Sequence, residues 1–282
     1  MRAVLRLLAV LLLAPLATLA AETKKADKLP PLLELGIGGG GGYVPDYPAA
    51  GQNHFNGIAL PFLVYRGSFL RAGDNAVLRG RLLHNDRIDF DVSLDGSFSA
   101  DSDKNDARKG MPDLDTMGEL GPRLQINLAR AARDAKIDLE LPLRAVFSTD
   151  FTSDLSYRGI VFHPEIAYQH GNFLGTGVAL KLGIGPIIAD EELMGYFYDV
   201  EPRFATAGRP SYKADAGYIG SQVGLRLVRR LGDRVTLFGL ANLGLHQGAT
   251  NEDSPLFRED TTWSVGLGMA WSFYQSDARG SR

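Results

Sequence analysis

Residues 261–273 of this 282-residue chain read TTWSVGLGMAWSF and alternate as a β-strand does. Every second residue is apolar, which gives the set Trp263, Val265, Leu267, Met269, Trp271 and Phe273. The residues between them are small or polar. Because side chains alternate across a strand, one face is apolar and the other is small and polar. One face of a soluble β-sandwich has the same pattern, so this stretch alone leaves a soluble and a membrane sheet open.

The only two tryptophans of the chain, Trp263 and Trp271, lie eight residues apart on that apolar face. Eight residues span about 26 Å along a strand. A tilt of roughly 40° reduces this to about 20 Å of height, close to the apolar band of an outer-membrane barrel. Aromatic rings gather at both rims of such a band. The spacing therefore predicts that Trp263 and Trp271 belong to an aromatic girdle.

The first residues predict export by the Sec pathway. Arg2 and Arg6 precede an apolar run over residues 7–16, and small residues follow at Thr18 and Ala20. This is the pattern of a cleaved signal peptide, expected over residues 1–20, and residues 21–31 are expected to form a flexible periplasmic leader. No later stretch offers 18 consecutive apolar residues, so no transmembrane helix is expected.

Composition excludes several classes of protein. The chain has no cysteine, which rules out disulfides and lipoprotein attachment. Its formal net charge is −3, and removal of Arg2 and Arg6 makes the mature chain more acidic. A nucleic-acid-binding protein would show a basic face, so no nucleic-acid partner is expected.

Alternating runs recur along the chain, at residues 58–64, 88–98, 120–128, 137–147, 160–168, 178–184, 219–227 and 235–245. The connections between them alternate between long, as at 187–216 and 247–260, and short, as at 231–233. Outer-membrane barrels have short periplasmic turns and longer outer loops. We therefore expect an all-β fold, a transmembrane antiparallel up-and-down β-barrel over residues 32–274. It should have about twelve strands, or ten as the alternative, including a tight turn at 73–75, and a tail over residues 275–282.

The inward faces of these runs carry charges of both signs: Asp89, Asp91, Asp95, Glu119, Arg123, Asp138, Glu140, Arg144, Glu165, Lys181 and Arg226. Twelve strands lie between filled eight-stranded barrels and open sixteen-stranded porins. We expect a lumen mostly occluded by ion pairs, and a small hydrophilic pore is the alternative.

Catalytic and cofactor motifs are not recognised in the sequence. Gly36, Gly38 and Gly41 match a dinucleotide-binding spacing, but a loop-like stretch follows where that motif needs a helix. These glycines more simply let a strand bend or leave space inside a narrow barrel. The five histidines are scattered, and no serine lies in a nucleophile motif. We therefore expect a non-enzymatic protein without metal or cofactor.

Five short motifs are distinctive: ELGIG at 34–38, YVPDYP at 43–48, LPFLVYRG at 60–67, YFYDV at 196–200 and GRPSY at 208–212. Together they resemble the MltA-interacting protein/OmpV family of Gram-negative outer-membrane proteins. The family usually ends on an aromatic residue, whereas this chain continues for nine residues after Phe273.

The resemblance implies a location in the outer membrane, among lipid and lipopolysaccharide. It also implies a scaffold or adaptor that holds two partners together, a murein-cleaving lytic transglycosylase and a murein synthase. A small channel and a surface antigen or adhesin are the alternatives. The long connection at 187–216 is the candidate partner-binding loop, or a plug of the lumen, because interfaces favour tyrosine and arginine. Its candidate residues are Tyr196, Tyr198, Arg203, Arg209 and Tyr212.

Overall fold

The computed structural model describes residues 30–66, 70–72, 78–84, 87–150 and 155–280. The expected signal peptide, nearly all of the leader, the turn at 73–75 and the last two residues of the tail lie outside the described residues. Residues 31–281 form one compact unit. No helix among the described residues is long and apolar enough to cross a membrane.

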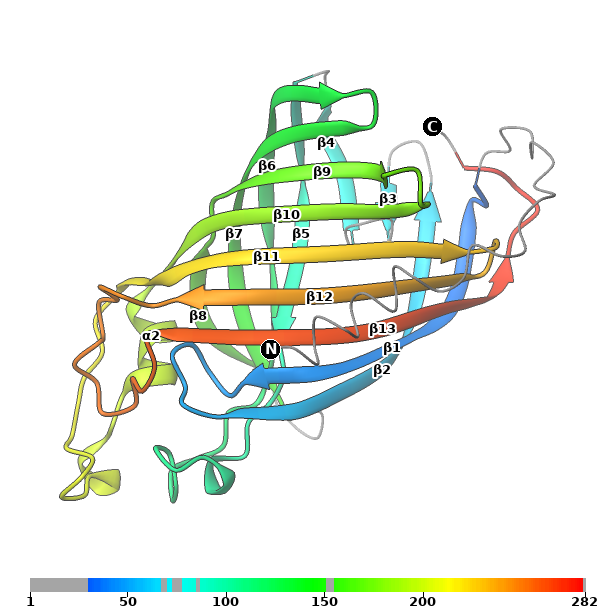
Figure 1. Cartoon of the computed structure of the whole chain (residues 1–282). Coiled ribbons are helices and arrows are strands. Elements are labelled where there is room, and N and C mark those ends of the chain that lie inside the picture. Colours follow the sequence, from blue (N-terminus) through cyan, green and yellow to red (C-terminus); the bar gives the residue numbers. More distant parts are fainter. Residues whose placement is uncertain (1–29, 67–69, 73–77, 85–86, 151–154, 281–282) are drawn as a thin grey trace. The chain divides into compact units, whose positions relative to one another are not determined.

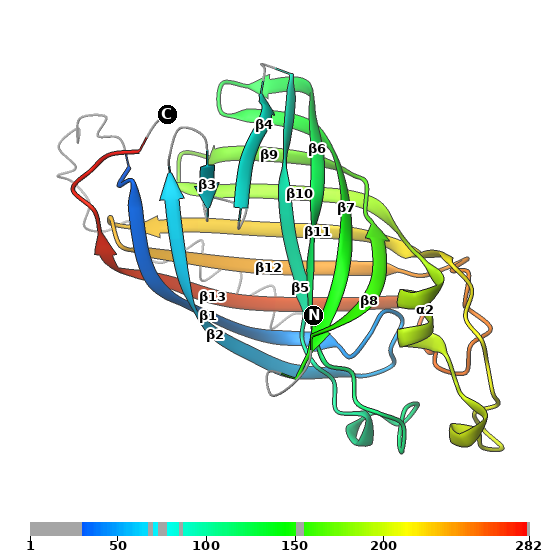
Figure 2. The same ribbon diagram turned by 180° about the vertical axis from the view of Figure 1, so that it is seen from behind.

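This unit is an antiparallel sheet in which most strands pair with their neighbours in the chain (Figures 1 and 2). Its strands are β1 (Leu33–Pro45), β2 (Asn53–Arg66), β3 (Leu70–Ala72), β4 (Leu78–His84), β5 (Ile88–Ser97), β6 (Thr116–Ala132), β7 (Ala135–Thr149), β8 (Leu155–Phe162), β9 (Glu165–Phe173), β10 (Val178–Ala189), β11 (Gly217–Leu231), β12 (Val235–Leu245) and β13 (Thr261–Gln275).

The strand pairings return to their starting point. The first strand, β1, pairs with both β2 and the last strand, β13. Strands β8 and β9 both pair with β7, β8 along its end and β9 along its start, so they are two parts of one interrupted strand. Counted in this way, the thirteen labelled strands of the described residues form twelve strands of the barrel. The expected antiparallel up-and-down barrel is confirmed.

One part of the ring has few described pairings. Strand β3 forms two residue pairs with β2 and two with β4, and β4 forms three with β5. By contrast, β1 and β2 share a continuous register from Leu33↔Tyr65 to Pro45↔Asn53. The described pairing is therefore sparse around β3 and β4 and continuous between β1 and β2.

The faces of β13 follow the sequence pattern. Trp263, Leu267 and Trp271 are 48%, 40% and 47% exposed, whereas Thr262 and Ser272 on the other face are buried. Register places Trp263 opposite Leu243 and Trp271 opposite Val235, at opposite ends of β12. Both tryptophans thus lie on the outer face near opposite ends of the strand. Their place at the rims of a lipid bilayer stays a prediction.

Strand β2 reverses the usual arrangement of faces. Its alternating apolar residues Ile58, Leu60 and Phe62 lie opposite Gly40, Gly38 and Gly36 of β1. Gly38 in turn lies opposite Ala270 on the inner face of β13. The apolar set of β2 therefore points into the lumen. Another set, which includes Phe55 and Leu63, points outward and is more than half exposed.

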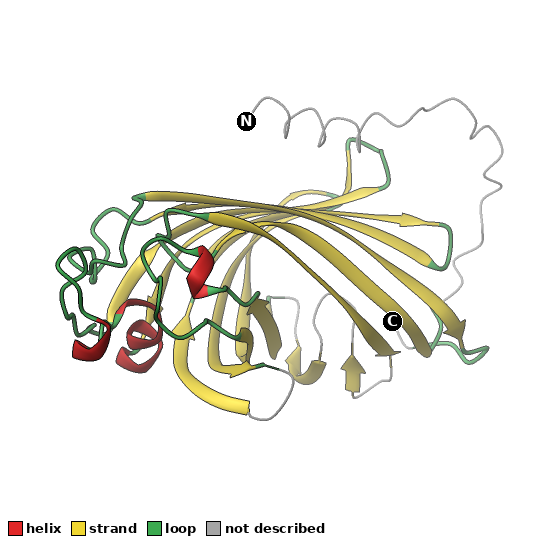
Figure 3. Ribbon diagram, turned by 90° about the horizontal axis from the view of Figure 1, so that it is seen from below, coloured by secondary structure: helices red, strands yellow, loops and turns green. Residues whose placement is uncertain are grey.

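The two ends of the sheet differ (Figure 3). Helix α2 (Glu191–Tyr198) and the short helices η1 (Ser102–Lys104) and η2 (Pro202–Phe204) all lie in the long connections at one end. At the other end, the first described residues pair with the tail, through a bridge between Pro31 and Arg279. The backbone N–H of Leu32 donates to the carbonyl of Ala278 at 2.8 Å there. The predicted sorting of connection lengths is confirmed for the described connections.

Candidate functional site

One side of the lumen carries a network of ion pairs, here called the charged wall: the lumen-facing side chains of β5, β6, β7, β9 and β10. The Arg123 guanidinium binds Asp91 at 2.7 Å and Glu140 at 3.1 Å. Lys181 binds Glu140 at 3.0 Å and also contacts Glu165. Because these pairs join five strands, the expected filling of the lumen by ion pairs of mixed sign is observed on this side.

Amides extend the same network. Asp138 is fully buried and receives hydrogen bonds from Gln125 at 2.7 Å and Asn127 at 2.9 Å. Lys136 also pairs with Asp138, at 2.8 Å. Buried carboxylates are costly unless charged or hydrogen-bonding groups surround them, and here they are surrounded.

The opposite side, here called the glycine wall, consists of the lumen-facing residues of β1, β2, β12 and β13. A side chain at Gly36 would overlap the ring of Phe62, and one at Gly268 would overlap the ring of Phe238. Phe238 lies opposite Gly268 in the register of β12 and β13. The glycines therefore leave the space that inward-facing rings occupy, as proposed from the sequence for the glycines of β1.

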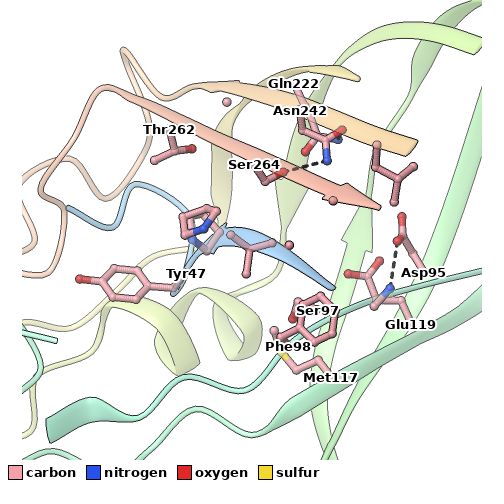
Figure 4. Close-up of a pocket in the computed structure, with 18 of the residues that line it drawn as sticks. Tyr47, Asp95, Ser97, Phe98, Met117, Glu119, Gln222, Asn242, Thr262 and Ser264 are labelled. Carbon is pink, nitrogen blue, oxygen red and sulfur yellow. Dashed lines mark hydrogen bonds between the residues drawn. The ribbon is translucent and has the colours of Figure 1, made fainter. Parts of the chain in front are cut away.

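Between the two walls, near the long connections, lies a cavity of about 570 Å³. Figure 4 shows Gln222, Asn242 and Ser264 on one side of it and Phe98, Met117 and Glu119 on the other. The Asn242 amide donates to the Ser264 hydroxyl at 3.1 Å. The floor of the cavity includes Ile58 and Leu60 of β2. The cavity is thus polar on some sides and apolar on others.

The long connections fold together over this end into a packed layer, here called the loop cap: residues 46–52, 98–115, 190–216 and 246–260. Met194, Tyr198 and Leu256 are fully buried in it. The Tyr198 hydroxyl donates to the Pro48 carbonyl at 3.0 Å, and the Tyr47 hydroxyl to the Leu256 carbonyl at 2.8 Å. Connections far apart in sequence are therefore held to one another.

Arg108 joins the same layer from the connection after β5. Its guanidinium donates to the carbonyls of Phe197 and Pro112, each at 3.2 Å, and lies 5.7 Å from the centre of the Tyr47 ring. Burial lowers the pKa of Arg108. Burial also raises the pKa of Tyr47 to about 12 and that of Tyr198 above its usual range. All three shifts have the same cause, which is exclusion of water from the loop cap.

The five candidate residues of the 187–216 connection separate into inward and outward groups. Tyr198 is buried, the Tyr196 hydroxyl accepts from the Asp115 N–H at 2.7 Å, and Tyr212 donates to Asn251 at 3.1 Å. Arg209 donates to the Ala107 carbonyl at 2.9 Å. Arg203 is exposed and pairs locally with Glu201. Four of the five therefore bind other parts of the loop cap, and Arg203 alone among them faces outward.

Sequence reasoning missed several residues of this site. Tyr47, in the motif YVPDYP, and Arg108 were not recognised as residues of the site, and neither were the inward faces of Leu60 and Phe238. One signal was available, since Gly36, Gly38 and Gly40 alternate with residues on the other face of β1. A row of glycines facing one way leaves room for large neighbours on the next strand.

A closed antiparallel sheet with an apolar outer face and a charged interior defines a transmembrane β-barrel protein. Residues 37–273 match the family described as MltA-interacting protein MipA. Since this match covers most of the chain, the chain belongs to the MipA family, and it is an outer-membrane protein.

Solved structures of other barrels resemble the chain weakly. They include the NanC porin, at 10% identity and a TM-score of 0.38 over 84% of this chain and 100% of that one. A bacterial polysaccharide outer-membrane secretin is 11% identical, with a TM-score of 0.38, over 86% of this chain and 99% of that one. A Pseudomonas aeruginosa FadL homologue is 13% identical, with a TM-score of 0.34, over 88% of this chain and 69% of that one. None of the curated proteins compared with the chain matches it.

Proposed function

We propose that this protein is a non-enzymatic adaptor of the outer membrane that holds a murein-cleaving lytic transglycosylase beside a murein synthase. The observation that carries the proposal is membership of a family described by its interaction with MltA. The packing of the barrel is compatible with this role, since ion pairs line one side of the lumen and the loop cap covers one end.

The contact surface for such enzymes is the end that carries the short turns. Both ends of the described barrel lie there, and in outer-membrane barrels the end with the short turns faces the periplasm, where murein lies. Its described parts are the turns at 133–134, 174–177 and 232–234 and the paired segments at 31–33 and 276–279. The loop cap lies at the other end, so we assign the candidate residues of 187–216 to the cap rather than to enzyme binding.

Photo-crosslinking in intact envelopes tests the adaptor. A photoreactive residue is placed at Arg133, Thr176 or Arg234, which are all exposed in the turns. Matched controls carry it at Lys109, Arg203 or Asp253, which are exposed in the loop cap. Capture of a lytic transglycosylase or a murein synthase at the turns, and not in the cap, supports the adaptor. Capture restricted to the loop cap would contradict the adaptor and favour a role at the cell surface.

A channel is the second candidate, because the lumen holds a cavity and the lumen-facing Arg226 is exposed. Planar-bilayer recordings separate the two candidates. The adaptor predicts small or absent conductance, since the charged wall and the loop cap obstruct the path. Large and stable steps would favour the channel.

A further inference from the structure

The cavity between the two walls is not used by the adaptor, and its lining has the features of a small-molecule site. Its volume of about 570 Å³ lies within the range of about 300–1,000 Å³ that ligand pockets span. Ligand pockets are mainly apolar with a few polar groups that set orientation, and this cavity has both kinds of lining.

The apolar part of the lining is exposed to the cavity rather than packed. Leu60 is 50% exposed and Leu240 is 38% exposed, although both point into the lumen. Ile58 and Phe238 lie beside them in the lining. Large apolar side chains exposed inside a protein favour an occupant that removes them from water. The body of such an occupant is therefore apolar.

Around Arg144, the lining has two carboxylates, Asp95 and Glu119, for one guanidinium group. Arg144 donates to Glu119 at 2.8 Å and lies 3.5 Å from Asp95. The Asp95 side chain is 58% exposed, and its Oδ1 accepts from the Gly96 N–H at 2.9 Å. A carboxylate has about four acceptor sites, so Asp95 keeps acceptor capacity toward the cavity. This favours a ligand that brings a positive charge and N–H donors.

A histidine lies in the same wall. His163 follows β8 and lines the cavity, and its Nε2 is buried without a hydrogen-bond partner among the described residues. A buried ring nitrogen without a hydrogen-bond partner is unfavourable. A polar group of a ligand near this wall would lower the free-energy cost, once a rotation of the His163 ring brings the nitrogen within reach. The cavity therefore has one end that favours donors and a floor that favours an apolar body.

We propose that this cavity binds a small molecule that joins a protonated amine to a compact apolar body. The amine binds Asp95 and Glu119 at the charged wall, and the apolar body lies against Ile58, Leu60 and Phe238. This inference goes beyond the adaptor and does not depend on it, because the cavity lies under the loop cap and the adaptor surface lies at the turns.

Isothermal titration calorimetry tests the proposal on the mature protein in lipid nanodiscs, with empty nanodiscs as the blank. The probes are 2-phenylethylamine, 2-phenylethanol and 3-phenylpropanoate, which share a phenyl body and differ in the polar group. We expect the amine to bind about tenfold more tightly than the other two, since a hydrogen bond to a charged group contributes that much. Equal binding of the three probes, or absence of binding by the amine, overturns the proposal without any variant.

Two pairs of variants locate the site. Asp95→Asn should remove the advantage of the amine over the alcohol, whereas Asp101→Asn in the loop cap should keep it. Leu60→Trp should fill the cavity and abolish binding of every probe, whereas Leu63→Trp on the outer face of β2 should not. Heat-modifiable migration on a gel confirms that each variant is folded. Unchanged amine binding in folded Leu60→Trp protein places the ligand elsewhere and overturns the proposal.

Discussion

The charged wall and the glycine wall belong to one sheet but fill the lumen in opposite ways. On the charged wall, Arg123 and Lys181 both bind Glu140, so each side chain depends on its partners. On the glycine wall, the rings of Phe62 and Phe238 occupy space that exists because Gly36 and Gly268 have no side chain. The first wall is therefore sensitive to the removal of groups, and the second to their addition.

Removal of a charge from the charged wall should have the largest effect. Arg123→Met takes two hydrogen bonds from Asp91 and one from Glu140, and both carboxylates are buried. Loss of one partner of a buried pair costs about 3–5 kcal/mol. Urea unfolding of the refolded barrel in lipid vesicles measures this loss. Lys104→Met, which breaks an exposed pair with Asp101, is the control and should leave the midpoint unchanged. Equal midpoints for the two variants would contradict the assignment of the network.

The outer and inner faces of β13 should differ next. Leu267→Arg should cost about 2–4 kcal/mol in a bilayer, because a charge at the midplane lacks partners. Gly266→Ser, on the inner face, should be mild, since the nearest atom to an added Cβ is the Gly41 carbonyl oxygen at 3.5 Å. The same vesicle unfolding measures both variants. Similar losses would mean that the faces of β13 are assigned the wrong way round.

Addition of a methyl group should separate the crowded glycines from the open ones. Gly268→Ala should destabilise by about 1–3 kcal/mol, the usual cost of overpacking, because the new Cβ overlaps the Phe238 ring. Gly38→Ala is the matched control, since its Cβ would meet Phe62 at an ordinary 3.6 Å. Replacement of Phe238 by leucine in the Gly268→Ala background should restore part of the loss. If Gly38→Ala is as harmful as Gly268→Ala, space for the ring is not the reason for the glycine.

The stability of the loop cap should change little on mutation of a single hydrogen bond, and it should fall at alkaline pH. Tyr47→Phe removes the hydrogen bond to the Leu256 carbonyl and should cost about 0.5–1.5 kcal/mol. Burial raises the pKa of Tyr47 from its ordinary value of 10.0 to about 12. This contribution to stability is full below pH 10.0 and is lost as the pH rises toward 12, because the unfolded chain ionises first.

Spectrophotometric titration of tyrosine, combined with protease sensitivity of the loops, measures this transition. In the wild-type protein, protease sensitivity should rise above pH 10.0, where only the unfolded form of Tyr47 ionises readily. In Tyr47→Phe protein, protease sensitivity should rise less above pH 10.0, because this residue no longer ionises. A wild-type cap that keeps its protease resistance to pH 12 would contradict burial of the tyrosines.

The sequence determines the strands of this protein and the order of its connections. Alternation at residues 261–273 places Trp263, Leu267 and Trp271 on one face, because a strand turns successive side chains to opposite sides whatever surrounds it. Mixed charges on the opposite faces also predict an interior of ion pairs, and the structure contains them.

Only the tertiary structure decides which groups meet and which face of a strand points inward. Arg123 pairs with Asp91, 32 residues away, and Lys181 with Glu140, 41 residues away. The reversed faces of β2 follow from its register against the glycines of β1, and Tyr198 is buried because four separate connections pack together. Alternation is a local property of the backbone, whereas register and loop packing depend on contacts between distant segments, which no single stretch of sequence contains.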